Sequence, residues 1–182
     1  RQTTHAAGIA ATQSAGMQQN RGTMCKSFHA GRAASNGVLA ALLAEKDFDS
    51  SIEILEGKRG FSRIYSTTTD LDKLTAKLGE DWMITGNGYK PHACGVVQHP
   101  MIDAMIALAR NHDIAPESIN SVHLKLHPGV IRITGVENPE NGLKSKFSLT
   151  HSAAVGYLDR TAGVRQYSNE RASSPDVISL RN

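Results

Sequence analysis

Aromatic residues and cysteines are scarce in this sequence, and long apolar runs are absent. Four Phe, four Tyr and one Trp leave few side chains on which nucleic-acid bases could stack. The net charge is only +3 and the basic residues are scattered, so the composition argues against a nucleic-acid partner. No stretch is long and apolar enough to predict a membrane span, and we expect no membrane association.

The two cysteines, Cys25 and Cys94, are too few for a disulfide framework, and neither lies in a nucleophile motif. We therefore expect a reducing, cytoplasmic environment. A hydrophobic fraction of 40% and a charged fraction of 20% are ordinary for a globular protein. The 182 residues suffice for one domain or two small ones with a hydrophobic core.

Helical patterns dominate the first half of the sequence. Segments rich in Ala and Leu predict helices over residues 4–17 and 30–44, a short helix that ends at Gly57, and a helix over 69–78. Residues 82–85 predict a short strand, and the turn residues 86–88 follow it. We place a domain boundary here, between residues 1–86 and residues 87–182.

The second half mixes the two patterns. Pro100 fits the first position of a helix that ends near Asn111. Residues 121–127 alternate with period two, which predicts a strand. A small-residue helix is predicted over 152–158, and Ser174-Pro175 opens a last short helix.

A polar joint precedes the helix at Pro100 and contains Lys90, His92, Cys94 and His99. A cation and imidazoles beside a helix start suit an anion, because helix N-terminal N–H groups and the helix dipole favour negative charge. A solvated loop with a capping histidine fits the same spacing equally well. Because His92, Cys94 and His99 lack a fourth ligand, we predict no metal site.

Two further polar groups are candidates for anion binding. His29 and Arg32 lie among small residues at the start of the helix over 30–44, and Arg offers a planar fork for carboxylates. A capping role for His29 and a surface ion pair for Arg32 explain the pattern as well, and Lys26 is a weaker candidate. In the second group, Lys146 and His151 accompany Ser148, which fits a helix cap as readily as a binding role.

Four stretches taken together resemble the MmgE/PrpD family, and their order and spacing match that family across nearly the whole chain. They are Lys26-Ser-Phe-His-Ala-Gly-Arg-Ala-Ala34, Ile54-Leu-Glu-Gly-Lys-Arg-Gly-Phe61, Lys90-Pro-His-Ala-Cys94 with His99-Pro100, and Lys146-Phe-Ser-Leu-Thr-His151. The family includes 2-methylcitrate dehydratases, cis-aconitate decarboxylases and iminodisuccinate epimerases. Their reactions share the removal or return of a proton next to a carboxylate.

The resemblance implies an α+β protein, in which a mainly helical domain is followed by a smaller, mixed α/β lid domain with the active site between them. It implies a homodimer that uses neither a metal nor an organic cofactor. It also implies residue roles, which fall into two sets. The catalytic candidates are His29, His151 and Lys90, and the substrate-binding candidates are Lys26, Arg32, His99, Lys146 and Ser148.

At some positions this sequence differs from the family pattern, and these differences limit which of the family's reactions we expect. Decarboxylase-type members carry Lys where this chain has Ser35 and His where it has Gly95, so the resemblance disfavours decarboxylation. The family also draws an Asp and His residues from a segment upstream of Arg1 and continues beyond Asn182. We therefore expect this sequence to be an internal portion of a longer protein.

The predicted function is a cofactor-free lyase or isomerase that removes a proton next to a carboxylate of a small di- or tricarboxylate. It would resemble either 2-methylcitrate dehydratase or iminodisuccinate epimerase. The alternative is a non-catalytic dicarboxylate-binding or dimerisation module that retains the fold.

Overall fold

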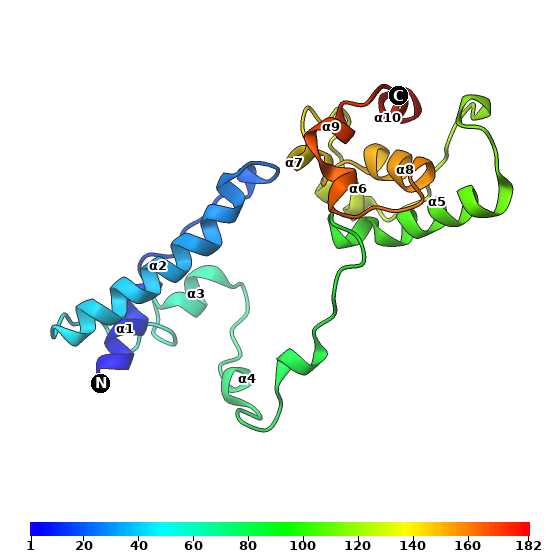
Figure 1. Ribbon diagram of the computed structural model, residues 1–182. Coiled ribbons are helices and arrows are strands. Elements are labelled where there is room, and N and C mark those ends of the chain that lie inside the picture. Colours follow the sequence, from blue (N-terminus) through cyan, green and yellow to red (C-terminus); the bar gives the residue numbers. More distant parts are fainter. The chain divides into compact units, whose positions relative to one another are not determined.

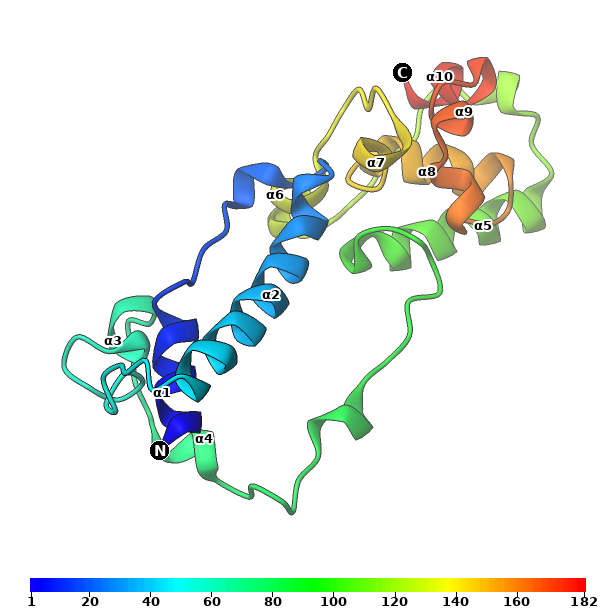
Figure 2. The ribbon, with the colours of Figure 1, turned by 60° about the vertical axis from the view of Figure 1, so that its left-hand side comes forward.

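The computed structural model describes residues 1–182 as two compact units, Arg1–Asn87 and Gly88–Asn182. Each unit consists of helices joined by turns and extended segments (Figures 1 and 2). None of these helices combines the length and the apolar character that crossing a lipid bilayer requires.

The first unit is built on the packing of α1 against α2 (Figure 1). Ile9 of α1 and Ala40 and Ala44 of α2 form its small buried core, since alanines let the two helices approach closely. Ser50, after α2, is tied back to α1 because its N–H donates to His5 Nδ1 at 3.1 Å. The helical elements of this unit are α1 (Gln2–Ala11), η1 (Gln18–Asn20), α2 (Cys25–Glu45), α3 (Phe61–Tyr65), α4 (Asp72–Thr75) and η2 (Met83–Gly86).

The second unit has the larger core, formed where α5 and α10 pack on α8. Ile102, Val155 and Val177 are fully buried there. Gly156 of α8 faces α5, and a Cβ atom at this position would lie 3.4 Å from Met105 Cβ. The helical elements are η3 (Val96–Gln98), α5 (His99–His112), η4 (Pro116–Ser118), α6 (Pro128–Thr134), α7 (Gly142–Ser145), α8 (Leu149–Leu158), η5 (Val164–Tyr167), α9 (Asn169–Ala172) and α10 (Pro175–Arg181).

The α5 and α8 helices lie side by side and run in the same direction. At their starts, Gln98 Nε2 donates to the Lys146 carbonyl at 2.8 Å. At their ends, the Tyr157 hydroxyl donates to the Ile114 carbonyl at 2.7 Å. The positive ends of both helix dipoles therefore lie at the same end of the pair.

The predicted α+β fold with a mixed α/β lid domain is wrong. The structure contains no strand, and its one β-bridge joins Gly135 to Ser148. Residues 121–127, where the alternation predicts a strand, have no regular secondary structure, and no neighbouring segment pairs with them. Residues 82–85 do not form a strand either, because Thr85 N–H and Oγ1 both bond the Trp82 carbonyl and close a helical turn.

Helix prediction was more accurate where a helix packs on a neighbour. The helices α5 and α10 are confirmed, and α2 is confirmed with an earlier start at Cys25. The helix predicted over 69–78 shrinks to α4, since Leu74 and Leu78 are exposed and pack on no neighbouring helix. The first helix ends at Ala11 rather than residue 17, and α8 begins at Leu149 rather than residue 152. The short helix predicted to end at Gly57 is absent, because residues 52–56 form turns.

The α5–α8 contact gives a stability prediction. Ile102→Ala should lower the free energy of unfolding by about 2–5 kcal/mol, because it leaves a cavity at a fully buried position. Leu108→Ala on the same helix, where the side chain is half exposed, should cost less than about 1 kcal/mol. Urea unfolding of both variants measures the difference, and equal losses would contradict this account of the core.

Candidate functional site

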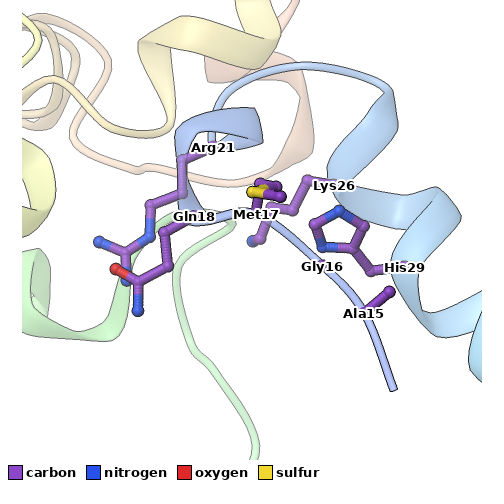
Figure 3. Close-up of a pocket in the computed structure, with 7 residues that line it drawn as sticks. All are labelled: Ala15, Gly16, Met17, Gln18, Arg21, Lys26 and His29. Carbon is purple, nitrogen blue, oxygen red and sulfur yellow. The ribbon is translucent and has the colours of Figure 1, made fainter. Parts of the chain in front are cut away.

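A cavity of about 320 Å³ lies beside the start of α2. We call it the α2 pocket, and its lining residues are Ala15, Gly16, Met17, Gln18, Arg21, Lys26 and His29. Figure 3 shows Gln18 and Arg21 on the connector before α2, and Lys26 and His29 on the first turns of the helix. Two of the candidates from the sequence, Lys26 and His29, line this pocket.

The lining of the α2 pocket carries positive charge and no carboxylate. The Arg21 backbone N–H donates to the Gln18 carbonyl at 3.1 Å, but its guanidinium group makes no hydrogen bond or ion pair, so this charge is not neutralised within the structure. Gly16 allows the chain to pass closely beneath His29, with φ of +134° and a Cβ position only 3.3 Å from His29 Nδ1. A cavity of this kind suits a small anion.

Sequence analysis missed Arg21 and overestimated the closeness of Arg32. Arg32 is exposed further along α2 and does not line the pocket. Arg21 lies in residues 18–23, which the sequence marked only as the break between two helices. Arg21 could have been found from its short distance in sequence to Lys26. A tight connector just before a helix keeps its side chains close to the start of that helix.

In the second unit, the polar joint folds over the start of α5. The Lys90 ammonium group donates to the Cys94 carbonyl at 3.3 Å. The buried His92 ring contacts Asp103 of α5, with 2.9 Å between Nε2 and Oδ1. His99 is also buried, and its Nε2 has no hydrogen-bond partner. Its ring lies edge-on to that of His92, with 5.1 Å between the ring centroids. Burial lowers the pKa of His99, and the charges of His92 and Lys90 lower it further.

The joint is bonded to the second predicted polar group. Both the Gln98 amide and the Gly95 N–H donate to the Lys146 carbonyl, at 2.8 and 3.3 Å. Ser148 is fully buried and accepts a hydrogen bond from the His151 N–H at 3.2 Å, so it caps α8. The structure thus brings together Lys90, His99 and Lys146, three candidates from two distant stretches.

His151 is fully buried behind this cap. Its Nε2 lies 2.8 Å from the Gln166 carbonyl, while Nδ1 is buried without a partner. Burial lowers the pKa of His151, and the charges of Arg181 and Arg171 add to this effect, whereas the bond to Gln166 opposes it. The imidazole is therefore neutral at pH 7.

Two residues that sequence analysis missed complete this interior. The hydroxyl groups of Ser152 and Tyr167 lie 3.0 Å apart, and both interact with the buried Cys94 thiol. Burial raises the pKa of the Cys94 thiol and also that of Tyr167, so both stay protonated near neutral pH. No group of three or more His, Cys, Asp or Glu side chains is arranged to hold a metal ion.

Comparisons with known proteins match both halves of the chain. Residues 1–74 match the MmgE/PrpD N-terminal domain, and residues 92–182 match the MmgE/PrpD C-terminal domain. Two cis-aconitate decarboxylase sequences of Aspergillus terreus, one from strain NIH 2624 / FGSC A1156, are each 26% identical over 196 residues. These matches cover 96% of this chain, which spans only 39% of the length of these relatives.

The buried histidines predict how stability varies with pH. Burial lowers the pKa of His99 and of His151 in the folded chain, so below about pH 6.5 the unfolded chain takes up protons that the folded chain excludes. The free energy of unfolding should therefore fall as the pH drops from 7 to 5. Urea titrations across this range measure the slope, and His99→Gln should reduce it more than His112→Gln at an exposed position.

Proposed function

Since the chain belongs to the MmgE/PrpD family, we propose that it forms part of an enzyme that removes a proton next to a carboxylate of a small di- or tricarboxylate. The reaction class is that of a lyase or an isomerase. The observation that carries this proposal is the α2 pocket, where His29 lies beside two cationic side chains and no acidic one.

In this mechanism, His29 is the base and the cations of the α2 pocket bind the substrate. His29 takes the proton, and the electron pair of the broken C–H bond moves into the adjacent carboxylate as an enolate. The Lys26 and Arg21 charges stabilise this enolate, because fixed positive charge favours the transition state more than the neutral C–H ground state. In elimination, the β-hydroxyl group takes the proton from the His29 imidazolium and leaves as water. In epimerisation, a second proton-transfer group delivers a proton to the opposite face.

The second unit offers a further anion-binding surface. Lys90, His99 and Lys146 gather where the positive ends of α5 and α8 lie together, an arrangement that favours carboxylates. We assign Lys90 to substrate contact during catalysis, His99, Lys146 and Ser148 to substrate binding, and His151 to proton transfer. Arg32, exposed on α2, is assigned to a further carboxylate.

Dehydration or epimerisation fits this chain better than decarboxylation, although the relatives named above are cis-aconitate decarboxylases. Decarboxylase-type members have His at the position of Gly95. A Cβ atom there would lie 3.1 Å from Thr134 Cγ2 and 3.3 Å from Gln98 Nε2. The packing around Gly95 leaves little room for an imidazole, which supports a reaction that does not need one.

Variants of the α2 pocket test the proposal in the full-length protein with 2-methylcitrate, cis-aconitate and iminodisuccinate as substrates. His29→Gln should lower kcat by about 100-fold or more, with KM changed little, because a base acts in the transition state. Lys26→Met and Arg21→Met should each raise KM by at least about tenfold, since each removes a charged contact.

Arg63→Met, at an exposed position in α3, is the matched control and should leave both constants unchanged. Binding of a substrate without turnover by the unmodified protein would favour a non-catalytic binding module. Turnover of His29→Gln within a few-fold of the unmodified protein would contradict the role of His29.

The proposed chemistry also predicts insensitivity to chelators. Proton removal by His29 with charge stabilisation from Lys26 and Arg21 requires no Lewis acid. Dialysis of the full-length protein against EDTA should leave kcat within about twofold. Loss of turnover on dialysis, restored by added zinc or iron, would overturn this mechanism.

A further inference from the structure

The tautomer of His151 is fixed by one hydrogen bond. A carbonyl oxygen can only accept, so the 2.8 Å contact between His151 Nε2 and the Gln166 carbonyl requires the proton on Nε2. In the neutral imidazole the lone pair then belongs to Nδ1. This Nδ1 is buried and has no partner, so it is an acceptor without a donor.

Gln166 is itself held in place by both ends of its side-chain amide. Its Nε2 donates to Asp159 Oδ2 at 3.0 Å, and its Oε1 accepts from the Gly163 N–H at 3.1 Å. Asp159 ends α8, the helix that begins beside His151. The carbonyl that orients the imidazole is therefore tied to the far end of the same helix.

Arg171 of α9 completes the arrangement. Its guanidinium group forms a two-pronged ion pair with Asp159, with 3.0 Å between Nε and Oδ2. The Arg171 Nη1 atom donates to the Ser174 hydroxyl and to Asp176 Oδ1, at 2.9 Å in each case. Only about a fifth of the Arg171 and Asp159 side chains is exposed, so loss of either partner would leave the other charge poorly solvated.

We propose that Arg171, Asp159 and Gln166 form a positioning chain that holds His151 with its proton on Nε2 and presents Nδ1 as the proton acceptor. The inference rests on the proposed function, because it gives His151 a part in proton transfer. In the reverse direction of the epimerisation, the proton arriving at Nδ1 would come from the substrate C–H group, whose electron pair stays on the substrate as an enolate, while His29 returns its proton to the other face. Gln166, Asp159 and Arg171 touch no substrate and act only through the imidazole.

The first measurement is the tautomer of His151 in the 182-residue chain, by NMR with ¹⁵N-labelled histidine and with His151→Gln to assign the signals. We expect a protonated Nε2 and an unprotonated Nδ1. In Arg171→Met, the two ring nitrogen signals should move towards each other, and the Nε2 proton should exchange with water about tenfold faster, as expected for loss of one hydrogen bond.

Arg160→Met is the matched control. It breaks an exposed ion pair to Asp113, 3.5 Å long, one residue beyond Asp159, and should leave the His151 signals unchanged. Arg171→Lys keeps the charge but not the planar fork, so it should restore the signals in part even if Arg171→Met fails to fold. In the full-length protein, Arg171→Lys should lower kcat with little change in KM, and Arg160→Met should change neither.

Three results would overturn the inference alone. They are a proton on Nδ1 in the unmodified chain, identical His151 signals in the Arg171 and Arg160 variants, and altered signals with an unchanged kcat. In each case the effect of His29→Gln still decides the proposed function. Absence of turnover on all three substrates by the unmodified full-length protein would overturn both.

Discussion

The second unit depends on the parallel contact between α5 and α8. Gly156 and Ile102 let the two helices approach, and bonds at both ends fix their alignment. This contact brings the joint at residues 90–99 beside residues 144–151, although about fifty residues separate them in sequence. The shared end of the pair then carries positive helix ends, lysines and buried histidines. The anion binding that we propose for this end would therefore result from core packing rather than from one motif.

The two candidate sites use positive charge differently. In the α2 pocket, Arg21 and Lys26 are exposed and line a cavity that a small anion would enter. In the second unit, His92, His99 and His151 are buried, and the protein itself fixes their hydrogen bonds and protonation. The first arrangement suits recognition of an anion, whereas the second suits control of a proton, because a buried imidazole responds strongly to its surroundings.

The sequence predicted helices well wherever an apolar stripe has a partner. The α5 stripe of Met101, Ile102 and Met105 packs on α8, whereas Leu74 and Leu78 meet no partner and most of the predicted helix is absent. The alternation over 121–127 predicted a strand, but a strand also requires a neighbouring segment to pair with, and none is present, so the α+β prediction failed. Lys26 and His29 were named as candidates because both lie in the stretch 26–34 that resembles the family. Tyr167 and Arg171 were missed because only the folded chain brings them to residues 152 and 159.

The close approach at Gly156 also limits how this chain can vary in evolution. A Cβ atom there would only touch Met105 and Ile102, but a side chain larger than that of alanine demands a smaller residue on the facing helix. These three positions are therefore expected to change together or remain fixed. Mutations that alter one helix alone would shift the other along its axis and displace the lysines at the shared end. Substitutions at these three core positions are thus expected to alter the placement of the charged residues at the shared helix end, although none of the three carries a charge.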